Sequence, residues 1–158
     1  MPHAERRERI LVRMRESVNQ LVRMVNELLA VSRAEEGERP LKLEPVVLDA
    51  LVHGVISRAA PEASERGIEL TAHLAGGDAR VMGDQEWLEQ ALGNVMGNAL
   101  KFTPRGGKVW ASTAARRGRT VIEVGDNGPG IPPDDLSRVF DKFYQVKQSN
   151  GVGLGLYL

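Results

Sequence analysis

The sequence predicts an α+β fold in two layers, in which helices cover one face of a mostly antiparallel sheet and a long bundle-forming helix precedes the sandwich. Two observations support this prediction. Residues 5–36 contain neither Gly nor Pro and repeat apolar residues three and four positions apart. From Leu41 onward, strand-like and helix-like segments alternate and are separated by turns rich in Gly and Pro. A boundary near Gly37 therefore divides the chain into residues 1–37 and 38–158.

The bulk composition narrows the classes of function. Lys and Arg together number 21, as do Asp and Glu, so a formal charge of zero favours neither nucleic acid nor an anionic membrane as a partner. The absence of Cys excludes disulfides, thiolate metal sites and cysteine nucleophiles. No apolar run approaches the roughly 20 residues of a membrane-spanning helix, so we expect a soluble piece. Its 158 residues suffice for one domain with an appended helix.

The segment without Gly and Pro predicts one long helix with a heptad seam. Further apolar residues widen the seam on both flanks, which favours packing in a helical bundle over a two-stranded coil. A solitary amphipathic helix that lies across its own domain is the alternative. Gly37 and Pro40 end the helix and begin a connector. The seam comprises Leu11, Met14, Val18, Leu21, Val25 and Leu28.

The next part of the chain is predicted to form a strand, a helix and a second strand. Leu41–Leu48 has the composition of a strand, and Asp49 is a candidate N-cap for a helix at Ala50–Arg66. We expect Pro61 to interrupt or offset that helix. The second strand follows at Ile68–Leu74.

The following part begins with a helix predicted from about Asp84 to Phe102. Lys108–Ala115 and Arg119–Gly125 then predict two antiparallel strands around a turn at Arg116–Gly118. The remainder is expected to be mostly loop, with one short helix near Pro133–Val139. The side of the long helix that faces the sheet is expected to carry Leu88, Ala91, Leu92, Val95 and Ala99.

Three polar residues share one side of that helix. Asn94, Asn98 and Lys101 are separated by four and three positions, so their side chains project together. An Asn carbonyl is a suitable oxygen ligand for magnesium that already holds phosphate oxygens, and Lys supplies a point charge for a phosphate. Taken alone, the stripe is weak evidence, because polar residues on an exposed helix face are usually only solvated.

Two Gly-containing loops follow. Asp126–Ile131 leaves a strand end with a carboxylate that can accept from an exocyclic amino group, although a plain Asx-Gly turn is the alternative. The oxygen ligands of an EF-hand are missing from it. Gly151–Leu156 is a glycine-rich turn before an apolar segment, where amide groups can gather around phosphate oxygens. It has neither the ending of a Walker A loop nor the context of a dinucleotide fingerprint.

Four motifs in order resemble those of sensor histidine kinases. Asn94–Thr103 resembles the N box, Asp126–Gly130 the G1 box, Phe140–Tyr144 the F box and Gly151–Leu156 the G2 box. The resemblance extends over residues 41–158 and implies the Bergerat-type sandwich that binds ATP, shared with gyrase, Hsp90 and mismatch-repair ATPases.

The resemblance implies ATP and Mg²⁺ as cofactors and assigns residues to them. Asn98 would be the metal ligand and, with Lys101, a catalytic residue, while Asp126 would hold the adenine amino group. The F box would anchor a lid at Gln145–Asn150 by burying its two Phe side chains, Phe140 and Phe143. The other residues expected at the nucleotide are Asn94, Phe102, Gly128, Gly130, Ile131, Phe143, Gly151, Gly153, Leu154 and Gly155.

The resemblance also implies the reaction and the partners. The γ-phosphate would move to a histidine on a two-helix hairpin of the same or a partner protomer, and then to an Asp of a response regulator. Residues 5–36 resemble the second helix of that hairpin, which suggests a homodimer in the parent protein. The need for ATP and the resemblance imply a cytoplasmic location and leave open whether the parent is anchored in a membrane. No nucleic-acid partner is expected. In the related ATPases a Glu four residues before the metal-binding Asn activates water; Asn94 stands there in this chain and cannot accept a proton.

Three features depart from the family pattern. No first hairpin helix is present, and His3, His53 and His73 lack the sequence context of a phosphoacceptor, so the last two are expected to be structural residues. The lid is short. The chain ends at Leu158, where the family continues with further strands, so we expect a part of a larger kinase with an unpaired sheet edge. A degenerate nucleotide-binding or scaffold module and an ATPase of the wider superfamily are the alternative functions.

Overall fold

The computed structural model describes residues 40–75 and 80–146, separate positions between 7 and 25, and positions 153, 156 and 157. The chain divides into two compact units: Pro40–Ser137 forms one, and Met1–Arg39 together with Arg138–Leu158 forms the other. Within the described residues, no helix combines the length and apolarity that crossing a membrane requires.

The described positions between Arg7 and Val25 are helical, so the predicted helix is confirmed at these positions. The described apolar side chains of its seam are well exposed, from 52% for Val25 to 62% for Leu11. Leu28 and the connector at Gly37 lie outside the described residues.

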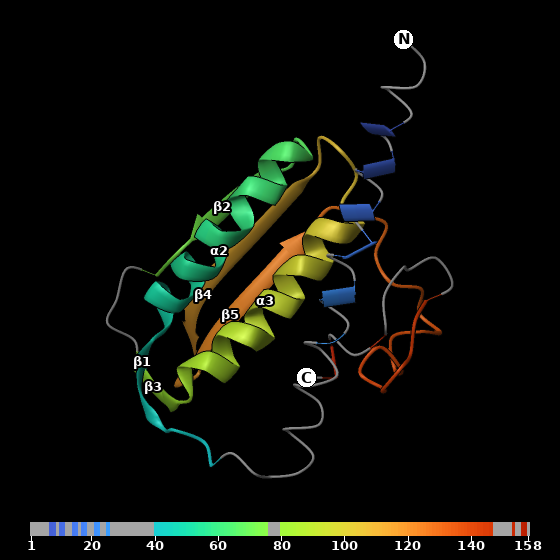
Figure 1. The fold of residues 1–158 in the computed structure, drawn as a ribbon. Helices are drawn as coiled ribbons and strands as arrows, with labels where there is room; N and C mark the ends of the chain where they lie inside the picture. The colour runs from blue at the N-terminus through green and yellow to red at the C-terminus, as the bar shows by residue number, and fades with distance from the viewer. Residues whose placement is uncertain are drawn as a thin grey trace. The chain divides into compact units, whose positions relative to one another are not determined.

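The unit Pro40–Ser137 is a two-layer sandwich, which confirms the predicted fold class (Figure 1). The central sheet has the order β2-β4-β5, with β2 parallel and β5 antiparallel to β4, and β1 and β3 form a separate antiparallel pair. Helices α2 and α3 lie side by side over one face of the central sheet. The elements are β1 (Glu44–Val47), α2 (Leu48–Glu65), β2 (Glu69–His73), β3 (Arg80–Gly83), α3 (Gln85–Phe102), β4 (Lys108–Arg116) and β5 (Arg119–Asp126).

The first strand is shorter than predicted, and β3 was not predicted at all. Leu41 and Leu43 are 60% and 59% exposed and precede β1. The backbone N–H of Lys42 donates to the carboxylate of Asp84 at 3.0 Å. This long-range bond ties the start of the unit to the beginning of α3. β3 has only four residues, too few for a recognisable alternation.

The prediction that Asp49 caps α2 is wrong. The helix begins at Leu48, Val47 occupies the N-cap position, and no side chain caps it. Asp49 lies in the first turn, where its carboxylate accepts a hydrogen bond from the hydroxyl of Thr113 at 2.5 Å. That hydroxyl also accepts from the backbone N–H of Ala75 at 2.9 Å. The Asp49 carboxylate, which the local sequence assigned to a helix cap, therefore bonds to a side chain on β4 instead.

The predicted interruption at Pro61 is also wrong, because α2 continues through it. Proline removes one N–H from the helix, but the turn beyond it buries Ala63 at 2% exposure. A Schellman motif then ends α2: the N–H of Ile68 donates to the Ala63 carbonyl at 2.8 Å, and that of Gly67 to the Ser64 carbonyl at 3.0 Å. The φ of +62° at Gly67 is the left-handed conformation that this motif requires.

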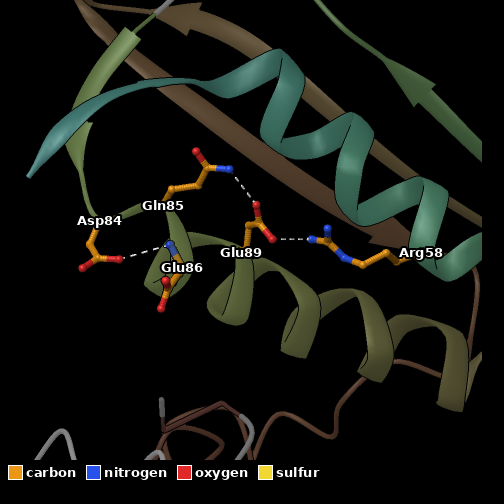
Figure 2. A network of polar contacts seen from close by, with 5 residues as sticks. All are labelled: Arg58, Asp84, Gln85, Glu86 and Glu89. Carbon is orange, nitrogen blue, oxygen red and sulfur yellow. Dashed lines mark hydrogen bonds and ion pairs between the residues drawn. The ribbon is translucent and has the colours of Figure 1, made fainter. Parts of the chain in front are cut away.

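Helix α3 begins as predicted after Asp84, which is 4% exposed and accepts the N–H groups of the first turn at 3.1 and 3.3 Å (Figure 2). One turn further, Glu89 pairs with Arg58 of α2 at 2.8 Å and accepts from the Gln85 side chain at 2.9 Å (Figure 2). These contacts hold the N-terminal part of α3 against α2.

The buried side of α3 differs from the predicted one. Ala91 is exposed and Val95 is 39% exposed, although both were expected to face the sheet. The reason is that α3 contacts both α2 and β5, so its apolar side is rotated toward residues that the prediction omitted. The buried and half-buried residues of this side are Leu88, Leu92, Met96, Ala99 and Leu100.

The hairpin of β4 and β5 is confirmed. Its two-residue loop, Arg117 and Gly118, has φ values of 51° and 75°, as a type I′ turn requires. Alternate residues of β4, such as Val109 and Ala111, are fully buried beneath the helices. Among the described residues, β5 pairs only with β4.

The short helix predicted near Pro133–Val139 is wrong, because this segment forms successive turns. The N–H of Asp135 donates to the Pro132 carbonyl at 2.9 Å and that of Leu136 to the Pro133 carbonyl at 3.3 Å, both across three residues. Leu136 is 53% exposed, so no apolar face is available to stabilise a longer helix here.

Candidate functional site

Helix α3 presents the polar residues that were predicted to hold metal and phosphate. Asn94 and Asn98 are half-buried and Lys101 is exposed. The side-chain amide nitrogen of Asn94 is buried and has no hydrogen-bond partner among the described residues. Because a buried polar atom without a partner is costly, this nitrogen fits a site that a polar ligand completes.

The last turn of α3 carries a cation beside an aromatic ring. The Nζ atom of Lys101 lies 5.1 Å from the centroid of the Phe102 ring, which is 41% exposed. A cation–π contact at an exposed site contributes about 0.5–1 kcal/mol, so a stronger anionic partner can compete for the ammonium. Phe102 also offers an accessible apolar surface next to this charge.

The loop after β5 is held in an Asx turn. Oδ1 of Asp126 accepts a hydrogen bond from the N–H of Gly128 at 2.8 Å. The second carboxylate oxygen of an Asx turn is open to a donor from outside the loop. A Cβ atom on Gly128 would lie 2.8 Å from that Oδ1 and 3.0 Å from the Phe102 carbonyl oxygen. Glycine is therefore required where this loop meets the end of α3.

Asn127 is a site residue to which sequence reasoning gave no role. Its side-chain oxygen accepts from the N–H of Lys108 at 2.7 Å, and its own N–H donates to the Lys108 carbonyl at 3.1 Å. These two bonds extend the hairpin by one residue and fix the exit of the loop from the sheet. The sequence feature that could have identified it is an Asn close behind a predicted strand, because Asn side chains there often bond to the backbone.

Other predicted site residues are placed less tightly or lie outside the described residues. Gly130 has open space around it, and Ile131 is 43% exposed beyond the Asx turn. Gly151, Leu154 and Gly155 are not among the described residues. Gly153 and Phe143 belong to the other unit, where the N–H of Phe143 donates to the Gly153 carbonyl at 2.8 Å.

The prediction that the F box buries its phenylalanines is wrong. Phe140 and Phe143 are 65% and 62% exposed. The segment is held by polar contacts instead: the Arg138 guanidinium lies 4.1 Å from the Tyr144 ring, and its Nε lies 3.7 Å from the Asp141 carboxylate. Backbone bonds and cation–π stacking thus take the place of the expected apolar anchor.

The two predicted halves of a nucleotide site meet within one unit. The Asx turn offers an acceptor for an amino group, and the adjoining end of α3 offers an amide side chain and an ammonium for metal and phosphate. No group of three His, Asp or Glu that could hold a metal ion alone occurs in the described part of the chain. A magnesium ion held by Asn98 would thus need further ligands, as one that arrives with triphosphate oxygens brings. His53 and His73 are exposed on α2 and β2.

Comparison with known proteins relates this site to one family. Residues 83–158 match the family of histidine kinase-, DNA gyrase B- and HSP90-like ATPases. The sensor protein kinase PmrB of Pseudomonas aeruginosa is 33% identical over 149 residues, which cover 92% of this chain and 31% of PmrB. The chain spans 31% of the length of PmrB and 37% of the length of the sensor-like histidine kinase SenX3 of Mycolicibacterium smegmatis.

Solved structures give the same relation. The mycobacterial sensor histidine kinase MprB is 32% identical with a TM-score of 0.65, over 73% of this chain and 74% of the MprB chain. Full-length ShkA, crystallised in complex with AMPPNP, is 34% identical with a TM-score of 0.80, over 95% of this chain and 32% of ShkA.

Proposed function

Because this chain belongs to the sensor histidine kinases, within the family of histidine kinase-, DNA gyrase B- and HSP90-like ATPases, we propose that its residues 38–158 are an ATP-binding catalytic domain. It transfers the γ-phosphate of ATP to a histidine of a separate helix. The phosphate then passes to an Asp of a response regulator. Catalysis of this kind depends mainly on positioning and charge neutralisation, which a rigid sandwich can supply.

One observation carries the proposal: the base-binding loop and the metal-binding helix adjoin at the contact of Gly128 with the Phe102 carbonyl. In our assignment Asp126 accepts from the adenine amino group, and Asn98 ligates Mg²⁺ that bridges the phosphates. Lys101 neutralises phosphate charge, and Asn94 donates its free amide hydrogens to the same ligand. The other residues that we assign to the nucleotide are Phe102, Gly130, Ile131, Phe143, Gly151, Gly153, Leu154 and Gly155.

Transfer is favoured over hydrolysis by the side chain at position 94. An amide cannot remove a proton from water at neutral pH, whereas a carboxylate can. The buried, unpartnered nitrogen of Asn94 is suited to donating to a phosphate oxygen. The domain therefore lacks a base for water at this position but retains a phosphate contact.

We assign residues 1–37 to the second helix of a dimerisation hairpin. The exposed apolar residues between Ile10 and Val25 support this assignment, because such a stripe needs a partner helix. The parent protein would then be a homodimer whose kinase domain lies in the cytoplasm, where ATP is available. The phosphoacceptor histidine would come from the first hairpin helix of the same or a partner protomer.

A phosphotransfer assay tests the proposal. The chain is incubated with γ-labelled ATP, Mg²⁺ and a separate hairpin that carries the phosphoacceptor histidine of a related kinase, and protein-bound and free phosphate are compared. We expect acid-labile label on the hairpin. Steady release of free phosphate from the chain alone would indicate an ATPase, and nucleotide binding without label on several hairpins would indicate a scaffold.

The metal assignment is tested with Asn98→Ala. We expect this variant to bind ATP equally weakly with and without Mg²⁺, while the wild-type chain binds more tightly with it. Gln85→Ala is the matched control, because it removes a side-chain amide from an exposed position at the other end of α3. A Mg²⁺ dependence that survives in Asn98→Ala would remove Asn98 as the metal ligand.

A further inference from the structure

The sequence leaves the end of α3 without one of its hydrogen-bond donors. Thr103 follows the helix in an extended conformation, with φ −71° and ψ 128°, as the residue before a proline prefers. In a continuing helix the carbonyl of Leu100 would accept from the N–H of residue 104. Pro104 has no N–H. The carbonyls of the last turn therefore need a donor from elsewhere in the fold.

Arg66, at the C-cap of α2, supplies this donor. Its Nη1 donates to the carbonyl of Leu100, and its Nη2 donates to the carbonyls of Lys101 at 3.2 Å and Thr103 at 3.0 Å. One guanidinium thus holds three carbonyl oxygens in a geometry that a single ammonium cannot reproduce. The Arg66 side chain is 33% exposed, and its charge-assisted bonds to the carbonyls of Leu100 and Thr103 are partly buried.

The backbone around Arg66 is itself fixed. The Schellman motif ends α2 at this residue, and the carbonyl of Gly67 accepts from the N–H of Gly106 at 3.1 Å. The carbonyl of Gly107 in turn accepts from the N–H of Glu69 at 2.9 Å. The loop after α3 is therefore bonded to the residues that follow Arg66, and the guanidinium projects from a rigid base.

The turn that Arg66 holds is the one on which the candidate nucleotide site is built. It carries Lys101, and its Phe102 carbonyl is the surface against which Gly128 packs. We propose that Arg66 is a positioning residue of the nucleotide site, which fixes the spacing between the phosphate- and metal-binding helix and the base-binding loop. This inference rests on the proposed function, because it gives Arg66 a role in that site.

The charge of Arg66 has a second effect on the same site. The C-terminal end of a helix carries a partial negative charge, which would repel the phosphates that Lys101 is proposed to attract. The guanidinium lies on the carbonyls that carry this partial charge and offsets it. Arg66 therefore favours an anionic ligand by geometry and by electrostatics, without touching it.

Affinity for Mg²⁺–ATP in the full chain tests the proposal, measured by titration calorimetry at a temperature where every variant is folded. We expect Arg66→Ala to weaken binding about tenfold and Arg66→Lys about threefold, since Lys keeps the charge but cannot reach three carbonyls. Arg58→Ala is the matched control, because Arg58 also joins α2 to α3 but pairs with Glu89 near the start of α3, far from the turn that Arg66 holds. We expect its affinity to stay within about twofold of wild type.

Amide hydrogen exchange without nucleotide provides a readout that is independent of ATP binding. Arg66→Ala should accelerate exchange at residues 97–103 and leave residues 88–92 unchanged, whereas a general loss of stability would accelerate both. Two results would overturn the inference and leave the proposed function standing: Arg66→Ala binds Mg²⁺–ATP as tightly as the wild-type chain, or Arg66→Ala and Arg58→Ala lose affinity equally. A wild-type chain that binds no nucleotide would overturn the proposed function, and local acceleration in that case would reduce Arg66 to a structural cap.

Discussion

Substitution of Asp84 by Ala removes a single carboxylate that holds two separate parts of the unit Pro40–Ser137. Oδ1 caps α3 through the N–H groups of Glu86 and Trp87, and Oδ2 accepts from the N–H of Lys42. The side chain is 4% exposed, so water does not readily replace it. The variant therefore loses an N-cap and leaves a second, partly buried donor without its acceptor.

The expected cost is the sum of three contributions. Loss of the cap costs about 1 kcal/mol. Loss of a negative charge at the N-terminus of a helix costs about 0.5 kcal/mol. A partly buried N–H at Lys42 without an acceptor costs about 1 kcal/mol. The free energy of unfolding should therefore fall by about 2.5 kcal/mol, which for a chain of this size lowers the melting temperature by about 5–10 °C.

Urea unfolding of the full chain, followed by circular dichroism at 222 nm, measures this cost. Asp84→Asn retains one side-chain oxygen and can satisfy the cap or Lys42 but not both, so it should lose about half as much stability. Gln85→Ala, an exposed neighbour on the same helix, should stay within about 0.5 kcal/mol of wild type. Equal losses in Asp84→Ala and Asp84→Asn, or a loss for Asp84→Ala as small as that control, would refute the reasoning.

Three further substitutions have distinct expected outcomes. A Cβ at Gly125 would overlap the indole of Trp110 on the neighbouring strand, so Gly125→Ala should cost about 1–2 kcal/mol in urea unfolding; a cost that persists in a Trp110→Val background would exclude this overlap. Thr113→Val removes the hydroxyl that donates to Asp49 and should cost about 1–3 kcal/mol, whereas Thr113→Ser should retain most of the stability; identical values would argue against the bond. Asp126→Asn should weaken ATP binding about tenfold, measured by displacement of a fluorescent analogue, with little change in the urea midpoint; unchanged affinity would remove Asp126 from the base site.

Local patterns in the sequence were sufficient for the elements whose stabilising contacts are local. Asp84 caps a helix that starts one residue later, and the two-residue loop at Arg117 and Gly118 sets the hairpin register. The order of these elements also predicted the two-layer sandwich. Asn94, Asn98 and Lys101 share one side of α3 for the same reason, because helical spacing alone determines it.

Contacts between distant residues were beyond local patterns. The prediction for Asp49 failed because the partner of its carboxylate, Thr113, lies 64 residues away in the sequence, beyond the reach of a local pattern. The strand at Leu41–Leu48 was predicted too long for the same reason, because the bond that holds Lys42 outside the strand is made with Asp84, 42 residues away. The exposure of Val95 depends on how α3 packs against α2 and β5 together, which the period of one helix does not determine.

The contacts at the two ends of α3 explain how a helix held mainly by apolar packing could carry the proposed ligand site with precision. Burial of Leu92, Met96 and Leu100 favours contact with α2 and the sheet, but hydrophobic attraction has no preferred direction and tolerates small shifts along the helix axis. Phosphoryl transfer does not tolerate such shifts, because misplacement by about 1 Å can cost two orders of magnitude in rate. Directional bonds at both ends, from Asp84 at the start and from Arg66 at the last turn, remove this freedom. The Leu100 carbonyl, which Pro104 leaves without a backbone donor, thus gives the fold a place where another helix can set the position of the proposed site.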